Sequence, residues 1–329
     1  MPYSANEMRY NLMKYRNLGS SGLKVPVVSL GFWHNFGSNG NFENMKRMCY
    51  TALDNGITYF DLANNYGPQP GAAEENLGKI LASDLKPYRD ELLIATKAGY
   101  YMWPGPYGDR GSRKYLLSSL DRSLQRMGLD YVDIFYHHRF DSETPLEETM
   151  LALDQAVRSG KALYVGISNY NADETERAIK ILRELKTPFV VNQVRYNMLD
   201  RHIEEDGLKE YAPKNGCGLV AYSPLAQGIL SDKYLNGIPS TSRIHTDGRF
   251  LKEENLTADV MEKVRALNEI ALMRGQSLSS LALSWILKDN DIASVIIGAS
   301  TPEQIAENAR VAFATPLTEE EIEEINKII

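Results

Sequence analysis

Short apolar runs alternate with longer stretches of helical period along almost the whole chain of 329 residues. Turn residues flank each run, as is typical of buried strands, and the stretches between them carry apolar residues at the spacing of one helix face. This regular alternation indicates a parallel sheet in which a helix follows each strand. The eight predicted strands are residues 27–31, 57–61, 92–97, 132–137, 163–167, 190–193, 219–222 and 294–297.

The predicted helices lead directly into the next strand. Glycine follows several of them, as at Gly56, Gly160 and Gly216, where a left-handed residue closes a helix without a steric penalty. The main predicted helices are residues 44–55, 74–82, 113–127, 146–159, 173–185, 205–215 and 278–287.

Parallel strands with covering helices can close into a barrel or lie open as a doubly wound sheet. The strand count, the even spacing and the lack of a Pro-rich or Ser-rich linker favour closure. We therefore predict an α/β fold, with a single (β/α)8 barrel domain over residues 1–329. The polar, Gly-rich segment 232–256 suits a flap over a site. Residues 318–329 are expected to form a terminal helix with Thr318 as its N-cap.

Charge and cysteine content restrict the class of partner. The net charge is −7 and the basic residues are scattered, whereas a nucleic-acid or anionic membrane surface needs a basic stripe. Cys49 and Cys217 are the only cysteines, so we expect a reducing compartment and no disulfide framework. No stretch approaches about 20 consecutive apolar residues. We therefore expect a cytoplasmic protein whose partner is a small molecule, with neither nucleic acid nor membrane as a partner.

In such a barrel, chemistry collects at the carboxyl ends of the strands. The second strand ends in Asp61 and Tyr66 follows it, the third ends in Lys97, and His138 follows the fourth. A phenol gives up its proton reluctantly at neutral pH, and an adjacent ammonium favours the phenolate. We interpret Tyr66 as the proton donor for carbonyl reduction, Lys97 as the cation that lowers its pKa, and Asp61 as the partner of Lys97. His138 would polarise and orient the substrate carbonyl, or share the proton.

Each of these residues also has an ordinary structural interpretation. Asp61 could cap a helix, and the Lys97 side chain could simply extend into solvent. One of the adjacent histidines, His137 and His138, could simply be packed in the core. Complementary side chains at neighbouring strand ends favour the catalytic interpretation.

The later strands end in amides, hydroxyls and an aromatic ring, which suits a nucleotide. The ring of Tyr222 can stack on a nicotinamide, and the helix start after the last strand presents N–H groups to phosphate. Lys233 and Arg243 in the flap would add positive charge for an extra phosphate. The predicted cofactor-binding residues are Trp33, Asp61, Ser168, Asn169, Gln193, Tyr222, Ser223, Pro224, Leu225, Ala226, Gly228, Lys233, Arg243, Gly298, Ser300, Gln304, Glu307 and Asn308.

Parts of this set have alternatives. Ser168, Asn169 and Ser300 could be helix N-caps, and residues 304–308 could be a plain solvated helix face. The run 216–221, GCGLVA, matches the dinucleotide fingerprint in letters, but it leads into a strand, so no Rossmann site is predicted. The five histidines lack metal-ligand spacing, so no metal site is predicted.

At these residues the sequence resembles the aldo-keto reductase family over essentially its full length. The resemblance implies NADPH bound extended across the barrel mouth and a catalytic tetrad of Asp61, Tyr66, Lys97 and His138. It rests on runs in family order and spacing: Asp61-Leu-Ala-Asn-Asn-Tyr66-Gly, Thr96-Lys97, Gly160 through Asn169, Tyr222-Ser-Pro-Leu-Ala226, and Gly298-Ala-Ser300 through Asn308.

Further runs resemble the subgroup of bacterial L-glyceraldehyde 3-phosphate reductases, which is itself similar to the β subunits of voltage-gated potassium channels. The runs are Trp33-His34-Asn35-Phe36, Gly67 through Asn76, and Ala98 through Trp103-Pro-Gly-Pro-Tyr-Gly. This resemblance implies reduction of L-glyceraldehyde 3-phosphate, and often of methylglyoxal, by a homo-oligomer, either a tetramer or an octamer.

A cluster of cations could bind the phosphate of such a substrate, and the candidates are Arg113, Lys114 and Arg139. The alternative is a solvated basic helix start or an ion pair with Asp109. The other predicted substrate residues are Trp33, His34 and Trp103.

Two other functions stay open from sequence. A redox-sensing accessory subunit would bind NADPH tightly and report the nucleotide state to a channel or another partner. His138 stands where we place asparagine in the channel subunits, so we favour the enzyme. An isomerase or aldolase could use Lys97 to form a Schiff base. Such an enzyme would not require Tyr66, Asp61 or the polar residues that follow the later strands.

Overall fold

In the computed structural model, which describes residues 3–240 and 242–329 apart from the side chains of Arg243 and Thr246, eight parallel strands close into a barrel. Neighbouring strands follow chain order, and β10 pairs with β3 to complete the circle. The predicted (β/α)8 barrel is confirmed. The strands are β3 (Val28–Gly31), β4 (Tyr59–Asp61), β5 (Leu93–Ala98), β6 (Val132–His137), β7 (Ala162–Ser168), β8 (Phe189–Arg195), β9 (Gly218–Tyr222) and β10 (Ile292–Ile297).

Strand positions agree with the predicted ranges to within two residues. The apolar runs were a reliable signal because parallel strands are covered on both faces, so that their sequences are nearly continuously apolar. Every residue of β5 and of β10 is buried. Inside the barrel, Leu93, Ile134 and Val191 belong to one apolar cluster, whereas the outward side chains pack against the helices.

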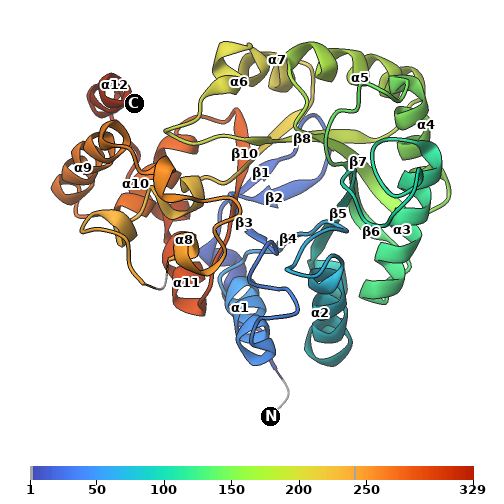
Figure 1. Cartoon of the computed structure of the whole chain (residues 1–329), viewed down its shortest axis with the longest axis horizontal. Coiled ribbons are helices and arrows are strands. Elements are labelled where there is room, and N and C mark those ends of the chain that lie inside the picture. Colours follow the sequence, from blue (N-terminus) through green and yellow to red (C-terminus); the bar gives the residue numbers. More distant parts are fainter. Residues whose placement is uncertain (1–2, 241) are drawn as a thin grey trace.

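Helices surround the barrel, as Figure 1 shows. Gly56 and Gly160 have φ values of 75° and 73°, so the predicted left-handed residues after α1 and α4 are confirmed. No helix in residues 3–240 and 242–329 is long and apolar enough to cross a membrane. The helices are α1 (Phe42–Asp54), α2 (Ala72–Ile80), α3 (Arg113–Met127), α4 (Leu146–Arg158), α5 (Ala172–Glu184), α6 (His202–Glu205), α7 (Leu208–Lys214), α8 (Arg243–Thr246), α9 (Ala258–Met273), α10 (Leu278–Ile286), α11 (Pro302–Ala309) and α12 (Glu319–Ile328).

Two helical predictions near the late half of the chain had different outcomes. The terminal helix is confirmed, because Thr318 accepts a hydrogen bond from the Glu321 amide in a capping box. The continuous helix over 205–215 is wrong. Gly207 takes φ 79° between α6 and α7, and Asp206 accepts a hydrogen bond from the backbone N–H of Leu208, so the chain breaks there into two short helices.

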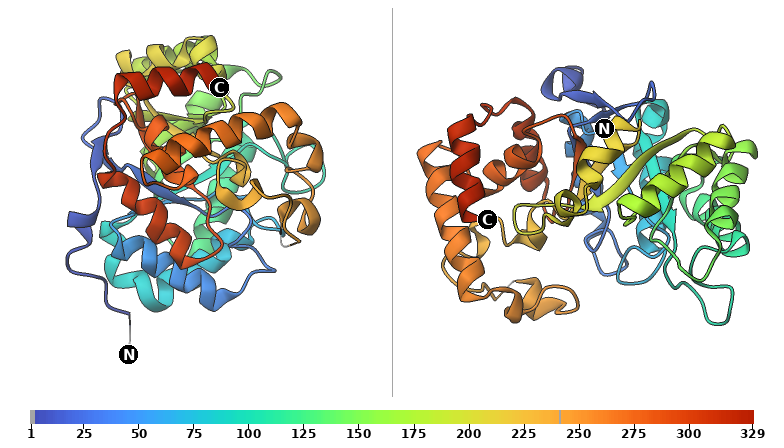
Figure 2. Two further views of the ribbon diagram at one scale, coloured as in Figure 1. Left: turned by 90° about the vertical axis from the view of Figure 1, so that its left-hand side faces the viewer. Right: turned by 90° about the horizontal axis from the view of Figure 1, so that it is seen from above.

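A hairpin that was not predicted closes the far end of the barrel. Its strands, β1 (Tyr15–Asn17) and β2 (Lys24–Pro26), pair antiparallel, and each is too short to give a sequence signal. Leu18 and Val25 are fully buried against the interior cluster. The right-hand view of Figure 2 shows this dark blue hairpin at the end opposite α8, so only the carboxyl ends of the strands lie at an open mouth.

A glycine in β7 makes room for an aromatic ring inside the barrel. Gly166 pairs with Tyr136 of β6. A Cβ atom at Gly166 would lie 2.6 Å from Cε1 of Tyr136 and 2.7 Å from Cγ1 of Val191. The barrel interior is therefore packed around the Tyr136 ring, and this packing depends on the missing side chain at Gly166.

We expect Gly166→Ala to lower the free energy of unfolding by about 1–3 kcal/mol, because overpacking a well-filled core displaces side chains and backbone. Gly22→Ala is the control, since a Cβ there would have no described atom within 4 Å. It should change stability by less than about 0.5 kcal/mol. Urea denaturation measures both changes, and equal effects would contradict the packing argument.

Candidate active site

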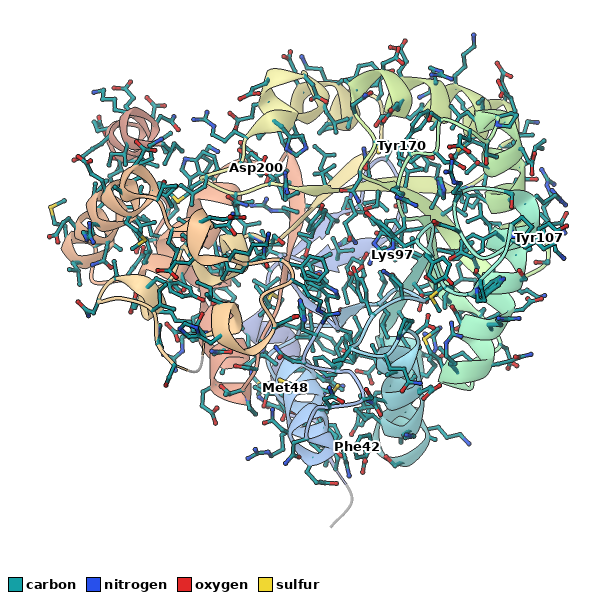
Figure 3. All side chains as sticks on the ribbon, in the orientation of Figure 1. Phe42, Met48, Lys97, Tyr107, Tyr170 and Asp200 are labelled. Carbon is teal, nitrogen blue, oxygen red and sulfur yellow. The ribbon has the colours of Figure 1, made fainter. Side chains whose placement is uncertain are left out.

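Asp61 and Lys97 form a buried ion pair at the carboxyl ends of β4 and β5. Lys97 Nζ lies 2.6 Å from Asp61 Oδ2 and donates a second hydrogen bond to the Leu62 carbonyl oxygen at 2.7 Å. The Lys97 side chain is 0% exposed and the Asp61 side chain is 2% exposed. Figure 3 shows Lys97 within the ring of strands. The alternatives, in which Asp61 caps a helix and Lys97 extends into solvent, are therefore wrong.

Tyr66 reaches this pair from the loop that follows β4. Lys97 Nζ lies 3.3 Å from Tyr66 Oη and 4.9 Å from the centre of its ring. The Tyr66 side chain stays partly exposed at the mouth. The structure therefore brings the predicted carboxylate, ammonium and phenol into one connected group.

Burial governs the acid–base properties of this group. It raises the pKa of Tyr66 well above its ordinary value, and the Asp61 charge adds to this effect. It also lowers the pKa of Lys97 and raises that of Asp61, because each charge leaves water, although their mutual attraction opposes both shifts. Burial outweighs any lowering of the Tyr66 pKa by Lys97, so the lowering that the sequence predicts stays a prediction. Tyr66 holds its proton firmly, and Lys97 lies where a phenolate would form.

The two adjacent histidines point to different surroundings. His137 Nδ1 lies 2.6 Å from Tyr170 Oη, and burial lowers the pKa of His137 to about 4, so this side chain is the packed one. The ring of His138 lies 5.8 Å from that of Tyr66 and 4.7 Å from that of Tyr100. Burial, reinforced by the Lys97 charge, places the pKa of His138 well below its ordinary value. His138 is therefore neutral at physiological pH.

Hydrogen bonds join the late polar residues to this group. Gln193 Nε2 donates to Asp61 Oδ1 at 2.7 Å, and Asn169 Nδ2 donates to the His138 carbonyl oxygen at 3.0 Å. Tyr222 Oη in turn donates to Asn169 Oδ1 at 2.8 Å. The two sets that the sequence placed in separate halves of the chain therefore belong to a single site.

The helix-cap alternative is wrong for the late residues. Asn171 caps α5 and Thr301 caps α11, whereas Ser168 Oγ donates to the Gln193 carbonyl oxygen at 2.8 Å. The Ser300 backbone N–H donates to Gln304 Oε1 at 2.8 Å.

The solvated-face alternative holds for part of α11. Gln304 and Glu307 are exposed, as that alternative predicts. Asn308 is buried and therefore departs from a plain solvated face. Gly298, which precedes the helix, is exposed at the end of β10.

The turn that follows β9 is conformationally strained. Ser223, Ala226 and Gln227 have positive φ values of 51°, 47° and 59° without being glycine. Asn169 after β7 and His34 after β3 share this property, with φ values of 59° and 63°. Such residues gather at ligand sites because the surrounding structure must hold them there. The predicted cofactor residues Ser223, Pro224, Leu225, Ala226 and Gly228 all lie in this turn.

The segment predicted as a flap contacts the residues that follow β3. Asp247 Oδ2 lies 3.1 Å from His34 Nδ1, and the Phe250 ring packs edge-on against Trp33 with centroids 4.7 Å apart. Figure 1 shows this segment around α8. Lys233 is exposed in a short 3-10 helix of the same segment, and the side chain of Arg243 lies outside the described part of the structure.

The predicted substrate cations have different surroundings. The backbone N–H and the guanidinium of Arg113 are bonded to α4, with Nη1 3.4 Å from the Leu151 carbonyl oxygen. Lys114 lies over the Tyr107 ring at 5.2 Å. Arg139 alone of the three connects to the site, because its guanidinium stacks on Tyr100, which contacts His138.

The expected ion pair with Asp109 is formed by Arg139, at 3.0 Å. Trp103 packs against Tyr115 with centroids 5.3 Å apart and receives Arg122 over its ring at 4.2 Å. These contacts pack Trp103, which lies in the loop after β5, against α3.

Sequence reasoning missed several residues of the site. Tyr100 contacts both His138 and Arg139, and Asp247 and Phe250 bring the flap onto the mouth. Tyr100 belongs to a run that the family resemblance had singled out, so a signal existed for it. Asp247 and Phe250 lie in an irregular segment, where spacing carries no information about contacts.

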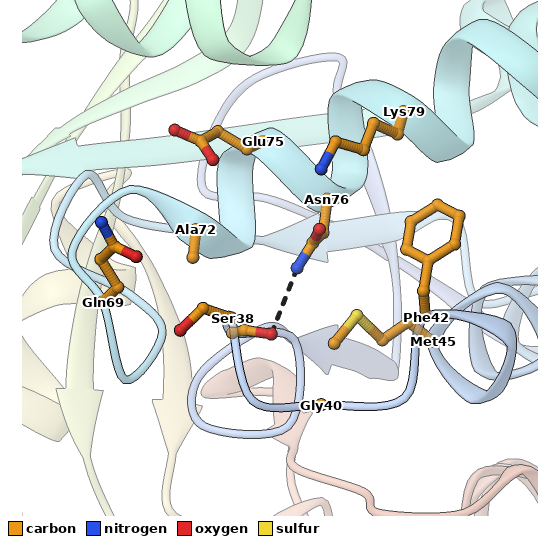
Figure 4. Close-up of a pocket in the computed structure, with 10 residues that line it drawn as sticks. Ser38, Gly40, Phe42, Met45, Gln69, Ala72, Glu75, Asn76 and Lys79 are labelled. Carbon is orange, nitrogen blue, oxygen red and sulfur yellow. Dashed lines mark hydrogen bonds between the residues drawn. The ribbon is translucent and has the colours of Figure 1, made fainter.

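A cavity of about 350 Å³ lies beside the mouth, between the loop after β3 and helix α2. Figure 4 shows that Asn76 faces this loop across the cavity. Asn76 Nδ2 donates to the carbonyl oxygens of Phe36 and Gly37, at 2.9 and 3.3 Å. The cavity contains none of the tetrad, and the Asn76 bonds hold the loop that carries Trp33 and His34.

A family model described as the aldo/keto reductase family matches residues 27–329. The chain belongs to this family. It is therefore an oxidoreductase, and aldo-keto reductases generally use NADP(H).

The family's solved structures and curated members agree with this assignment. The crystal structure of a thermostable aldo-keto reductase with the inhibitor epalrestat matches with a TM-score of 0.76 and 32% identity, over 96% of this chain and all of that one. The L-glyceraldehyde 3-phosphate reductase of Escherichia coli K12 is 53% identical, over 100% of this chain and 96% of that protein. A probable voltage-gated potassium channel subunit beta from Arabidopsis thaliana is 36% identical, over 95% and 96% of the two chains.

Removing one partner of the buried pair should be costly. We expect Lys97→Met to lower the free energy of unfolding by about 3–5 kcal/mol, because the Asp61 carboxylate remains buried without its cation. Adding Asp61→Leu in the same chain should recover part of this loss. Urea denaturation of the two single variants and the double variant measures the coupling free energy between Lys97 and Asp61. Strictly additive effects would show that their interaction contributes nothing to stability.

Proposed function

We propose that this aldo-keto reductase reduces small aldehydes with NADPH, and that L-glyceraldehyde 3-phosphate and methylglyoxal are among its substrates. The observation that supports the proposal most directly is the contact of Lys97 Nζ with both Asp61 Oδ2 and Tyr66 Oη, at 2.6 and 3.3 Å. It joins a proton donor, a cation that stabilises its conjugate base and a carboxylate that fixes the cation.

The proposed roles follow from charge and burial. Tyr66 donates the proton that the carbonyl oxygen receives. Its raised pKa keeps it protonated until that oxygen gains negative charge and becomes a base. Lys97 then stabilises the phenolate across 3.3 Å. His138 is neutral and therefore acts as a hydrogen-bond donor that polarises the carbonyl without competing for the proton.

The late residues fit an NADPH molecule by the chemistry of their groups. Gln227 Oε1, in the strained turn after β9, is buried and has no hydrogen-bond partner among the described residues, so a ligand N–H or O–H would satisfy it. A Cβ at Gly298 would meet no described atom within 4 Å, which leaves space at the end of β10. Asn169 and Tyr222 would bind the nicotinamide end and α11 the phosphates. When bound, NADPH supplies the hydride.

Tyr66→Phe should bind NADPH with unchanged affinity and lose most aldehyde-dependent NADPH oxidation, because the variant keeps the ring and loses the proton. General acid catalysis contributes about 10²–10⁴-fold, so we expect a loss in that range. Titration with NADPH and NADH, followed by a panel of phosphorylated and free aldehydes, measures affinity and turnover. An unchanged rate would remove Tyr66 from the mechanism.

Arg139 is the proposed anchor for a substrate phosphate. Its guanidinium stacks on Tyr100 at 4.5 Å, and Tyr100 packs on His138. The Nε atom is held by the Gly99 carbonyl oxygen at 2.9 Å. Asp109 neutralises part of the charge and would give way to a phosphate, which arginine binds with two parallel hydrogen bonds.

We expect Arg139→Ala to raise KM for L-glyceraldehyde 3-phosphate about tenfold or more, because a charged hydrogen bond contributes about 1.5–3 kcal/mol. KM for unphosphorylated glyceraldehyde should stay nearly unchanged. Arg113→Ala is the matched control, since Arg113 is engaged with α4. If KM rises equally for both substrates in Arg139→Ala, Arg139 does not recognise the phosphate.

The rival functions fit the site less well. A Schiff-base enzyme needs a free amine, whereas Lys97 Nζ is bonded to Asp61, to the Leu62 carbonyl oxygen and to Tyr66. An accessory subunit has one supporting observation, the similarity to plant potassium channel β subunits. Absence of aldehyde-dependent NADPH oxidation over the whole panel would favour it.

We also propose a cytoplasmic homo-oligomer, either a tetramer or an octamer, as the subgroup resemblance implies. The mass of the native protein in solution, measured by light scattering, distinguishes these states from a monomer.

A further inference from the structure

Tyr115 of α3 is a fully buried tyrosine whose hydroxyl bonds to two loops of the barrel mouth. Its Oη accepts a hydrogen bond from Asn64 Nδ2 at 3.1 Å and donates one to the Tyr100 carbonyl oxygen. Asn64 belongs to the loop after β4, and Tyr100 belongs to the loop after β5. The hydroxyl therefore joins these two loops, and no step of the proposed reduction uses it.

The loop after β4 carries the proton donor. The backbone N–H of Asn64 donates to the Lys97 carbonyl oxygen at 2.9 Å, and that of Tyr66 donates to the Ala63 carbonyl oxygen at 3.0 Å. Asn64 Oδ1 is buried and has no hydrogen-bond partner among the described residues. The bond from Nδ2 to Tyr115 is therefore the one that fixes the Asn64 side chain, two residues before Tyr66.

The loop after β5 forms the wall beside His138. The Gly99 carbonyl oxygen accepts a hydrogen bond from Arg139 Nε at 2.9 Å, and the next carbonyl oxygen, that of Tyr100, accepts the bond from Tyr115. These two bonds fix the backbone that carries the Tyr100 ring, which packs on the His138 ring with centroids 4.7 Å apart. Tyr115 therefore acts on His138 through Tyr100.

The position of Tyr115 itself is fixed by its helix. Its backbone N–H donates to Oγ of Ser112, the N-cap of α3, at 3.3 Å. Its ring packs on Trp103 with centroids 5.3 Å apart. A side chain that is packed on all sides cannot follow the movement of a loop, so its hydroxyl is a fixed point for both loops.

We propose that Tyr115 is a positioning residue for the reduction, whose hydroxyl holds the loops after β4 and β5 at the spacing that lets Tyr66 and His138 bind one carbonyl oxygen. The centroids of the Tyr66 and His138 rings are 5.8 Å apart, so a small displacement of either loop separates the proton donor from the polarising group. The effect on turnover rests on the proposed function, whereas the connection between the loops is a property of the fold.

The chain offers a matched pair of variants. Tyr115→Phe removes the hydroxyl and keeps the ring that packs on Trp103. Tyr196→Phe is the control, because Tyr196 is likewise fully buried and its hydroxyl donates, among the described residues, only to Glu204. Both variants lose one buried tyrosine hydroxyl, so a loss of stability alone should affect them alike. Asn64→Ala removes the bond to Tyr115 from the other side.

The first readout is turnover of glyceraldehyde with NADPH. We expect Tyr115→Phe to lower kcat about tenfold, with KM and the NADPH Kd within about twofold of the original values, because the loops lose their spacing while the binding groups remain. Asn64→Ala should lower kcat about threefold to tenfold, as the loss of one neutral hydrogen bond implies. The double variant should be no slower than Tyr115→Phe, since that change already breaks the shared bond. Tyr196→Phe should keep kcat within about twofold.

The second readout is hydrogen exchange of the backbone amides, which requires no turnover. In Tyr115→Phe, peptides that cover residues 62–66 and 99–108 should both exchange about twofold to tenfold faster, because the loss of one neutral hydrogen bond changes a local opening equilibrium by that factor. In Tyr196→Phe, the same peptides should keep their original rates.

Unchanged exchange in either loop of Tyr115→Phe overturns the positioning role whatever the activity. An unchanged kcat in Tyr115→Phe also overturns it, as does an equal loss of kcat in Tyr196→Phe. If Tyr115→Phe does not fold, Asn64→Ala decides, and unchanged exchange at residues 62–66 or an unchanged kcat overturns the role. An original protein without aldehyde reduction, whose two loops both exchange faster in Tyr115→Phe, would reject the proposed function and leave the connection between the loops supported.

Discussion

The buried pair of Lys97 and Asp61 is the constraint on which the site depends. A charge in the barrel interior is tolerated only when its partner and its remaining hydrogen bonds are in place, and both conditions are met here by Asp61 and the Leu62 carbonyl oxygen. Because the pair is fixed by adjacent strands, Tyr66 needs only to fold back over it from the next loop to reach the ammonium. A rigid sheet thus sets the geometry, and a loop presents the donor at the mouth.

The closure of the barrel makes one site out of distant segments. Gln193 is separated from Asp61 by 132 positions in sequence and yet donates to its carboxylate. Asn169 holds the His138 backbone, and Tyr222 holds Asn169. The residues assigned to the nucleotide therefore also support the residues assigned to the proton transfer, so a change in either group is expected to affect both. The flap adds a third segment through its contacts with Trp33 and His34.

Desolvation has opposite consequences for the acidic and basic groups of this site. It keeps Tyr66 protonated, because the phenolate loses more solvation than the phenol, and it keeps His138 neutral, because the imidazolium does. The same burial would neutralise Lys97 and Asp61 if they were apart, and their contact at 2.6 Å opposes that outcome. The protonation states that the proposed reduction needs therefore follow from the burial of the site as a whole.

The sequence by itself determined the strands, most helices and the residue types at the strand ends, because buried parallel strands are continuously apolar and polar residues stand out directly after them. It also identified Asp61, Tyr66, Lys97 and His138 as candidates. Only the tertiary structure showed that Gln193 contacts Asp61, that Arg113 faces α4 while Arg139 faces the site, and that burial raises the pKa of Tyr66. Contacts between distant segments and the loss of solvent arise when the barrel closes, and neither has a local pattern in the chain.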